Sequence, residues 1–196
     1  MNPIAMAPYH APAYPRLTAE LDNMITHQRL PESQPGAAAS HLKILFLHGS
    51  KSIPGSIQPA FLAQQGHELL KPTMREEDFA EDVRIAQAEF DRHQPDFVVG
   101  WSRGAAVAMS IHSGKSRLVL LCPDWKKYGT ATAVKPNAVI LHSRADDVVP
   151  FADSEELARN SGLPASALIE VGTDHLLADP QSLSAVLGAC TVTTRH

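Results

Sequence analysis

The sequence predicts an α/β fold: a doubly wound, mostly parallel sheet of about six strands with helices on both faces. Short apolar runs without polar alternation recur along the chain, as expected for strands buried on both faces of a sheet. Amphipathic or alanine-rich stretches of helical length separate these runs. Alternation of strand and helix is typical of a parallel sheet covered by two layers of helices.

The predicted strands are apolar runs of three to six residues, and the weakest are the second and the last. They are Leu42–Leu47, Glu68–Leu70, Phe97–Val99, Leu118–Cys122, Ala138–Leu141 and Leu168–Val171. The predicted helices are Glu77–His93, Arg103–His112, Asp153–Ser161 and one that begins at Asp179-Pro180. We expect the third of these helices to open with a capping box formed by Asp153 and Glu156.

The composition is that of a globular chain, with 44% hydrophobic and 19% charged residues. A formal net charge of −4 gives no electrostatic reason to expect a nucleic-acid partner. No apolar stretch approaches the roughly 20 residues that span a bilayer, and we expect neither a membrane partner nor a secretory signal. Cys122 and Cys190 lie in apolar runs and are expected to be buried thiols, which favours the cytoplasm.

Residues 1–40 differ from the rest of the chain because they contain six prolines. They bracket one candidate helix, Arg16–Leu30, whose apolar residues have helical spacing. We therefore expect a Pro-rich arm over 1–40 and one α/β domain over 41–196. Two alternatives stay open for the arm. Its helix docks on this domain or on a neighbouring copy, which would give a homo-oligomer, or the arm is a tail without an energetic role.

A G-x-S-x-G pattern follows the strand Phe97–Val99, with Gly100 and Gly104 on either side of Ser102. A serine hydroxyl is a poor nucleophile and needs exposure, a base and stabilisation of the oxyanion that it creates. A sharp turn from a strand into a helix supplies the exposure, and the helix N-terminus supplies free N–H groups. The strand–turn–helix setting is stronger evidence for this chemistry than the bare pattern.

Two later segments carry an acid and a base. Asp146 and Asp147 follow the fifth strand, and His175 follows the last strand after a glycine turn. Taken alone, the acids are as well explained by capping of a loop, and the histidine by a solvated surface position. Together with Ser102 they have the order serine, acid, histidine, each at the C-terminal end of a parallel strand. Open α/β sheets bind their ligands at that edge.

The first strong strand runs into His48-Gly49-Ser50. The backbone N–H of Ser50 is placed to point at an oxyanion, together with the N–H of Arg103. His48 could be a second base, but the more economical interpretation is a structural ring that bonds back into its loop.

From Leu42 to Cys190 the chain resembles the α/β-hydrolase superfamily, in particular a small lidless branch of esterases and thioesterases. The segments L-H-G-S, G-W-S-R-G-A, H-S-R-A-D-D-V-V-P and G-T-D-H follow in the order expected for it. The resemblance implies a truncated fold without the first two strands and without a cap domain, because the connection Cys122–Pro136 is too short for one. It favours Asp146 over Asp147, since the acid of the superfamily usually stands four residues before the proline.

We therefore expect a carboxylesterase-like or thioesterase-like serine hydrolase that cleaves a small ester or thioester through an acyl-enzyme. Ser102 would attack, His175 would transfer the proton and Asp146 would orient His175, while the amides of Ser50 and Arg103 hold the oxyanion. No cofactor and no metal are expected.

Two other classes of function compete with this hypothesis. One is a non-catalytic binding protein with the same fold. The other is a metallohydrolase built on His48, His142, Asp146 and His175, although no H-E-x-x-H spacing supports it. Without a cap, substrate specificity must come from short loops. The candidates to line the pocket are Lys51, Trp101 and Trp125, and both tryptophans are equally consistent with packing.

Overall fold

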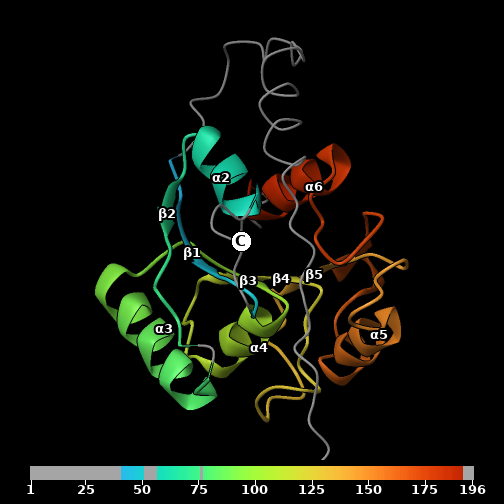
Figure 1. The fold of residues 1–196 in the computed structure, drawn as a ribbon, viewed down its shortest axis with the longest axis horizontal. Coiled ribbons are helices and arrows are strands. Elements are labelled where there is room, and N and C mark those ends of the chain that lie inside the picture. The colour runs from blue at the N-terminus through green and yellow to red at the C-terminus, as the bar shows by residue number, and fades with distance from the viewer. Residues whose placement is uncertain (1–40, 51–56, 76, 192–196) are drawn as a thin grey trace, which may run out of the picture. The chain divides into compact units, whose positions relative to one another are not determined.

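The computed structural model describes residues 41–50, 57–75 and 77–191. Within these residues a six-stranded sheet has the order β2-β1-β3-β4-β5-β6, and every neighbouring pair is parallel (Figure 1). The strands are β1 (Lys43–Leu47), β2 (Glu68–Leu70), β3 (Phe97–Trp101), β4 (Arg117–Leu121), β5 (Val139–His142) and β6 (Leu168–Glu170). The predicted fold class and its strands are confirmed.

Helices cover both faces of the sheet (Figure 1). They are α2 (Ile57–Gln64), α3 (Phe79–His93), α4 (Arg103–Ser110), α5 (Phe151–Asn160) and α6 (Pro180–Thr191). Helices α2 and α6 lie on one face, and α3, α4 and α5 lie on the other. No cap domain interrupts the described sheet and helices, as the sequence predicts.

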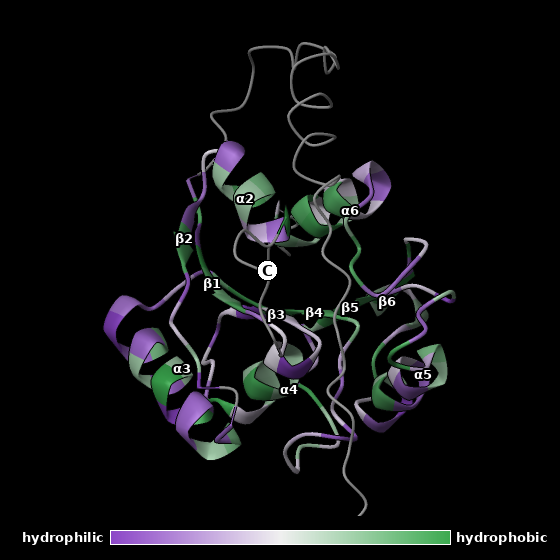
Figure 2. Cartoon of the chain, viewed as in Figure 1, coloured by the Kyte–Doolittle hydropathy of each residue, from purple (hydrophilic) through white to green (hydrophobic). Residues whose placement is uncertain are grey.

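Two apolar cores result from this layering. Ile44 and Phe46 point into the core beneath α2 and α6, whereas Leu45 and Leu47 of the same strand point into the core beneath α3, α4 and α5. Successive residues of a strand face opposite sides, so a strand buried on both sides must be apolar throughout. Helix α3 instead alternates hydrophilic and hydrophobic residues along its length, because only one of its faces is buried (Figure 2).

The helix boundaries reveal one error and one omission in the sequence analysis. Helix α5 begins at Phe151, so Asp153 lies in the first turn and forms no capping box with Glu156. Its carboxylate is instead 2.9 Å from the ammonium of Lys126, outside the helix. Helix α2 is not predicted from the sequence, whereas the cap of α6 is confirmed by a 3.0 Å hydrogen bond from the amide of Ser182 to Asp179.

The strand order reverses between β1 and β3, which are neighbours in the sheet although the chain visits β2 between them. The connections from the two strands leave toward opposite faces of the sheet, and open α/β sheets usually bind their ligands at such a point, beyond the C-terminal ends of the strands. Ser50 follows β1 and Ser102 follows β3, and the candidate site therefore lies at this switch point.

Among the described helices, none has both the length and the apolar character needed to cross a membrane. The predicted arm over 1–40, its candidate helix Arg16–Leu30 and the pocket candidate Lys51 all lie outside the described residues.

Candidate active site

Ser102 occupies the turn between β3 and α4. Its backbone has φ 54° and ψ −118°, a combination that a non-glycine residue adopts only when its surroundings impose it. The amide of Ser102 donates a 2.8 Å hydrogen bond to the carbonyl of Leu121 on β4, which ties the turn to the neighbouring strand. Strain held in this way is typical of a nucleophile presented at the start of a helix.

Gly100 and Gly104 make this turn sterically feasible. A Cβ atom on Gly100 would lie 2.6 Å from the Cα of Ala105, and one on Gly104 would overlap the carbonyl oxygen of Leu47. Helix α4 therefore approaches β1 and β3 more closely than any side chain at these positions would allow. The two glycines of the G-x-S-x-G pattern therefore have a steric role.

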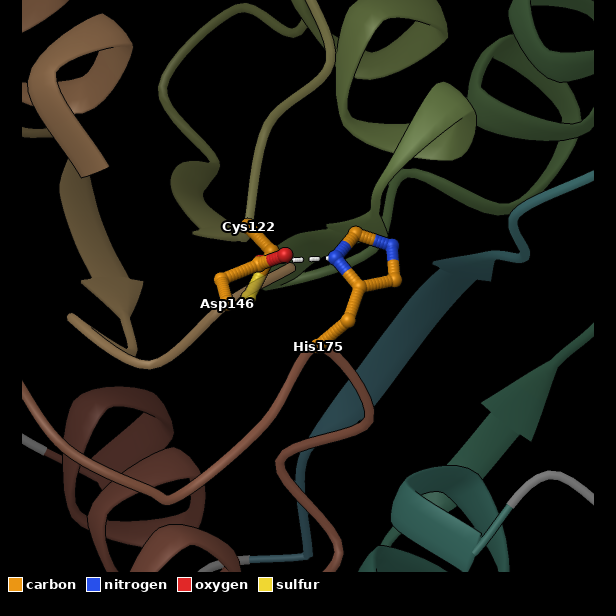
Figure 3. A group of neighbouring side chains, drawn as sticks. All are labelled: Cys122, Asp146 and His175. Carbon is orange, nitrogen blue, oxygen red and sulfur yellow. Dashed lines mark hydrogen bonds and ion pairs between the residues drawn. The ribbon is translucent and has the colours of Figure 1, made fainter. Parts of the chain in front are cut away.

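Asp146 and His175 meet at the same edge of the sheet (Figure 3). Nδ1 of His175 lies 2.7 Å from Oδ2 of Asp146, whose side chain is fully buried. Asp147 is exposed, so the structure brings the predicted acid, and not its neighbour, to the histidine. Although burial opposes ionisation, hydrogen bonds from His142 and His175 hold the pKa of Asp146 well below its ordinary value, helped by two backbone amides.

The loop that carries His175 is attached to the turn of Ser102. The indole N–H of Trp101 donates a 2.9 Å hydrogen bond to the carbonyl of His175, and the two rings lie 5.5 Å apart between centroids. Gln58 on α2 donates to the carbonyl of the next residue, Leu176. Trp101, which sequence analysis treats as a pocket candidate, is only 9% exposed and anchors this loop.

No hydrogen bond joins the Ser102 hydroxyl to the His175 ring within the described residues. Ser102 and His175 are 8% and 9% exposed as whole residues, and their loops are joined through Trp101. Contacts of this kind often tighten only when substrate is bound. The serine–histidine contact, and with it the catalytic roles of all three residues, stays a prediction.

The loop after β1 passes directly against Ser102. A Cβ atom on Gly49 would lie 3.2 Å from the Cβ of Ser102, and Ser50 is the next residue of this loop. The hydroxyl of Ser50 is 3.4 Å from that of Tyr128. His48 bonds through Nδ1 to the carbonyl of Gly49 at 2.9 Å, which agrees with the structural interpretation of this ring.

The side chain of Arg103 is buried beside the serine turn, a feature that sequence analysis missed. Its guanidinium is paired with the carboxylate of Asp82 on α3, and the two side chains are 2% and 0% exposed. The guanidinium carbon lies 5.4 Å from the ring centroids of both Phe79 and Tyr128. This set fixes the start of α4, where the N–H of Arg103 lacks an intrahelical partner.

Trp125 is buried except along one side. Its indole N–H donates a 3.0 Å hydrogen bond to the carbonyl of Asp153, which ties the loop after β4 to α5. The tryptophan also lines an open hollow of about 440 Å³ together with Lys126, Thr130, Thr132, Glu156 and Asn160. Within the described residues no hydrogen bond or ring contact joins Trp125 to Ser102, so the role of Trp125 in binding substrate stays a prediction.

Among the described residues one group of side chains could ligate a metal ion, and it differs from the four residues of the metallohydrolase hypothesis. Cys122, Asp146 and His175 offer ligand atoms within 4.8 Å of one another (Figure 3). Burial and the nearby carboxylate of Asp146 raise the pKa of the Cys122 thiol far above its ordinary value. A thiol that stays protonated is a poor metal ligand, because metals bind the thiolate.

Solved structures of other proteins share this arrangement of strands and helices. Alpha/beta hydrolase domain-containing protein 10 from mouse superposes with a TM-score of 0.58 at 14% identity, over 79% of this chain and 89% of that one. An alpha-beta serine hydrolase homologue from Coxiella burnetii gives 0.58 at 16% identity, over 80% and 86%. The chain has an α/β-hydrolase fold.

The esterase domain from a Rhodothermus marinus protein superposes with a TM-score of 0.51 at 17% identity, over 76% of this chain and 82% of that one. No protein-family model and no curated protein sequence matches the chain. At these identities the likeness concerns the fold, and the chemistry must be argued from the residues themselves.

Proposed function

We propose that the protein is a serine hydrolase that cleaves a small carboxylic ester or thioester through an acyl-enzyme intermediate. The 2.7 Å contact between Asp146 and Nδ1 of His175 carries this proposal. A carboxylate at Nδ1 keeps the ring proton there and leaves Nε2 as a free base. The strained turn of Ser102, tied to the same loop through Trp101, supports the serine as the partner of that base.

In the acylation step, Oγ of Ser102 forms a bond to the carbonyl carbon of the substrate while its proton passes to Nε2 of His175. The π electrons of the carbonyl move onto oxygen and give a tetrahedral oxyanion. Its collapse breaks the bond to the alcohol or thiol, which leaves with the proton from His175. Asp146 stays ionised and stabilises the imidazolium that exists between the two transfers.

In the deacylation step, water takes the place of the serine hydroxyl. It gives a proton to His175 and adds to the acyl carbon, and collapse of the second intermediate returns that proton to Oγ of Ser102. The products are a carboxylic acid and the restored enzyme. The reaction needs no oxidant, reductant or cofactor.

We assign the oxyanion to two backbone amides, those of Ser50 and Arg103. The amide of Arg103 lies at the start of α4, where the N–H groups are free and the helix dipole favours negative charge. The loop of Ser50 lies against Ser102, as the position of Gly49 requires. Donors fixed before the reaction stabilise the developing charge without reorganisation.

Substrate selection would fall to short loops around the serine, and we keep Lys51, Trp101 and Trp125 as its candidates. The absence of a cap in the described fold favours small substrates with an accessible carbonyl. A panel of p-nitrophenyl esters of increasing acyl length, measured beside acyl-CoA thioesters, distinguishes an esterase from a thioesterase and gives the preferred acyl group.

The nucleophile is tested by labelling the full chain with a fluorophosphonate probe and measuring its intact mass. The probe reacts only with a serine that a base activates. We expect the wild-type protein to gain one adduct and Ser102→Ala to gain none. Ser110→Ala is the matched control, because Ser110 lies on the same helix and its hydroxyl donates to the carbonyl of Ala106. Its labelling should equal that of the wild type.

A wild-type protein that remains unlabelled and hydrolyses no ester in the panel would overturn the proposal. The fold would then belong to a non-catalytic binding protein.

A further inference from the structure

A second histidine contacts the acid of the proposed triad. His142 is the last residue of β5, and its side chain is 0% exposed. Its Nε2 lies 3.0 Å from Oδ2 of Asp146 and 3.1 Å from the carbonyl oxygen of Val149. Its Nδ1 lies 2.7 Å from the hydroxyl of Ser154 on α5. Both ring nitrogens are therefore engaged with protein groups, and the mechanism above uses neither.

The partners of His142 determine which nitrogen carries the proton. A carboxylate and a carbonyl can only accept hydrogen bonds, so the N–H of the ring must be on Nε2. Nδ1 then presents a lone pair, and the hydroxyl of Ser154 donates to it. Ser154 thus fixes the tautomer in which His142 is a donor to Asp146, and the ring of Phe151, 5.4 Å away between centroids, packs beside it.

The two oxygens of Asp146 have different partners. Oδ1 accepts from the amides of Val148 and Val149 at 2.8 and 2.9 Å, so the loop itself holds the carboxylate in place. Oδ2 accepts from His142 and His175. The second histidine is therefore not needed to place the acid, but it shares the oxygen that the proposed base uses.

We propose that His142, oriented by Ser154, is a positioning residue that limits how strongly Asp146 holds the proton on His175. The inference rests on the proposed function in its use of His175 as base. A carboxylate oxygen with a second donor carries less free charge and stabilises an imidazolium less. His142 therefore lets His175 stay unprotonated, and able to accept the serine proton, at a lower pH than a simple aspartate–histidine pair would allow.

Other titratable groups face this cluster. Cys122, at the end of β4, carries no charge because burial and Asp146 raise the pKa of its thiol. Asp174 precedes His175, and its carboxylate accepts from the amides of Leu176 and Leu177. Burial raises the pKa of Asp124, which also interacts electrostatically with His175. Asp124 is thus the group whose titration could be mistaken for an effect of His142.

A purely structural role for His142 is the competing explanation. It predicts lower stability when the ring is removed, with no change in the pH at which His175 titrates. His142→Gln distinguishes the two roles. Glutamine places an amide N–H close to the position of Nε2, although it cannot reproduce the contact with Ser154.

The test follows the His175 imidazole resonances by NMR as a function of pH, and the pH profile of kcat/KM beside them, in the full chain. In His142→Ala we expect the midpoint of the His175 titration, and the acid limb of the profile, to rise by about one pH unit. That size corresponds to a hydrogen bond to a charged group. His142→Gln should restore the wild-type midpoint, and Ser154→Ala should raise it by a smaller amount.

Asp124→Asn is the control. Introduced together with His142→Ala, it should leave the rise caused by the loss of His142 intact. A midpoint in His142→Ala that equals or falls below the wild-type value would overturn the inference, as would a His142→Gln variant that behaves like the alanine variant. If His142→Ala does not fold, an unchanged midpoint in Ser154→Ala overturns it instead.

The NMR titration needs no turnover, so the two proposals can fail separately. A shifted midpoint in a protein that neither labels nor hydrolyses esters would refute the proposed function and support the role of His142 at the oxygen of Asp146 that it shares with His175. A labelled, active enzyme without the shift would refute only the inference.

Discussion

Two buried carboxylates lie on either side of the serine turn, and their partners differ. The side chains of Asp82 and Asp146 are both 0% exposed. Asp82 is paired with the guanidinium of Arg103, a cation at every accessible pH. Asp146 is surrounded by two imidazole rings and two backbone amides. One carboxylate faces a fixed charge, and the other faces groups that can gain or lose a proton.

This difference separates a carboxylate that can only stabilise the fold from one whose partners can take part in proton transfer. A buried ion pair between groups that never exchange a proton can only hold α3 against the start of α4. The imidazole of His175 can accept a proton and return it, so the set around Asp146 can take part in a reaction. Changes at Asp82 should therefore appear in stability, and changes at Asp146 in turnover.

The largest expected effects are losses of turnover, in Ser102→Ala and in Asp146→Asn. An amide that donates to Nδ1 would force the ring proton onto Nε2 and remove the base, so kcat should fall by roughly 10⁴-fold. Ser102→Ala should leave still less activity, because the nucleophile itself is absent. Steady-state kinetics on the best ester of the panel measures the turnover of each variant, and thermal unfolding measures its stability. Comparable activity in Asp146→Asn and wild type would contradict the proposed role.

Asp82→Ala should act in the opposite way. It leaves the Arg103 guanidinium buried without a counter-charge, and we expect a loss of about 3–5 kcal/mol in the free energy of unfolding. Chemical denaturation measures this loss. Combining Asp82→Ala with Arg103→Met should recover part of the loss, because the uncompensated charge is gone and the backbone amide of residue 103 remains. A double variant no more stable than Asp82→Ala would show that packing, and not the charge, dominates here.

Activity and stability should also depend on pH in different ranges. As the pH falls from about 8 to about 5, kcat/KM should decline because protonated His175 cannot accept the serine proton. Stability should fall in a lower window. The pKa of Asp146 lies below its ordinary 3.8 in the folded chain, so below about pH 4 the unfolded chain binds more protons and folding loses free energy.

Unfolding by denaturant at a series of pH values, in wild type and in Asp146→Asn, tests whether the free energy of unfolding falls with pH in this window. The variant should lack part of the acid dependence that the wild type shows. A rate that stays constant between about pH 8 and about pH 5 would argue against a histidine base.

The smallest effect belongs to an exposed ion pair that serves as a reference for the buried one. Lys126 lies 2.9 Å from Asp153 and 2.6 Å from Glu156. Lys126→Ala should change the free energy of unfolding far less than Asp82→Ala does, because water and salt screen these charges. A loss comparable with that of Asp82→Ala would mean that burial does not separate the two sites.

The sequence was sufficient to predict the strands and the turn around Ser102, because both follow from local patterns. Apolar runs predict doubly buried strands, and glycines at Gly100 and Gly104 predict close approach of the backbone. Helix α2 was missed because its apolar residues do not form one clear face and Pro59 lies within it. The capping box at Asp153 was wrong because α5 begins two residues earlier, at Phe151, and the carboxylate of Asp153 contacts Lys126 instead.

The buried polar partners were not predictable from local pattern. Asp82 lies on an amphipathic helix, where an acid would ordinarily face water, and Arg103 stands at a variable position of the G-x-S-x-G motif. His142 is the last residue of a strand, where a polar residue is ordinarily expected to be exposed to solvent. Each partnership joins residues from different elements, so it emerges only when the fold brings those elements together.

The glycine contacts have a consequence for redesign of the chain. Position 104 can accommodate no side chain, because any Cβ there would meet the backbone of Leu47 and His48. Position 188, in the last turn of α6, has nothing within 4 Å of a Cβ, and alanine there should stabilise the helix by about 0.5–1 kcal/mol. Mutational tolerance should thus differ sharply between two helical glycines. In a saturation library, folded variants should keep glycine at 104 and accept many residues at 188. Such a library would show which positions near the serine turn tolerate substitution and which do not.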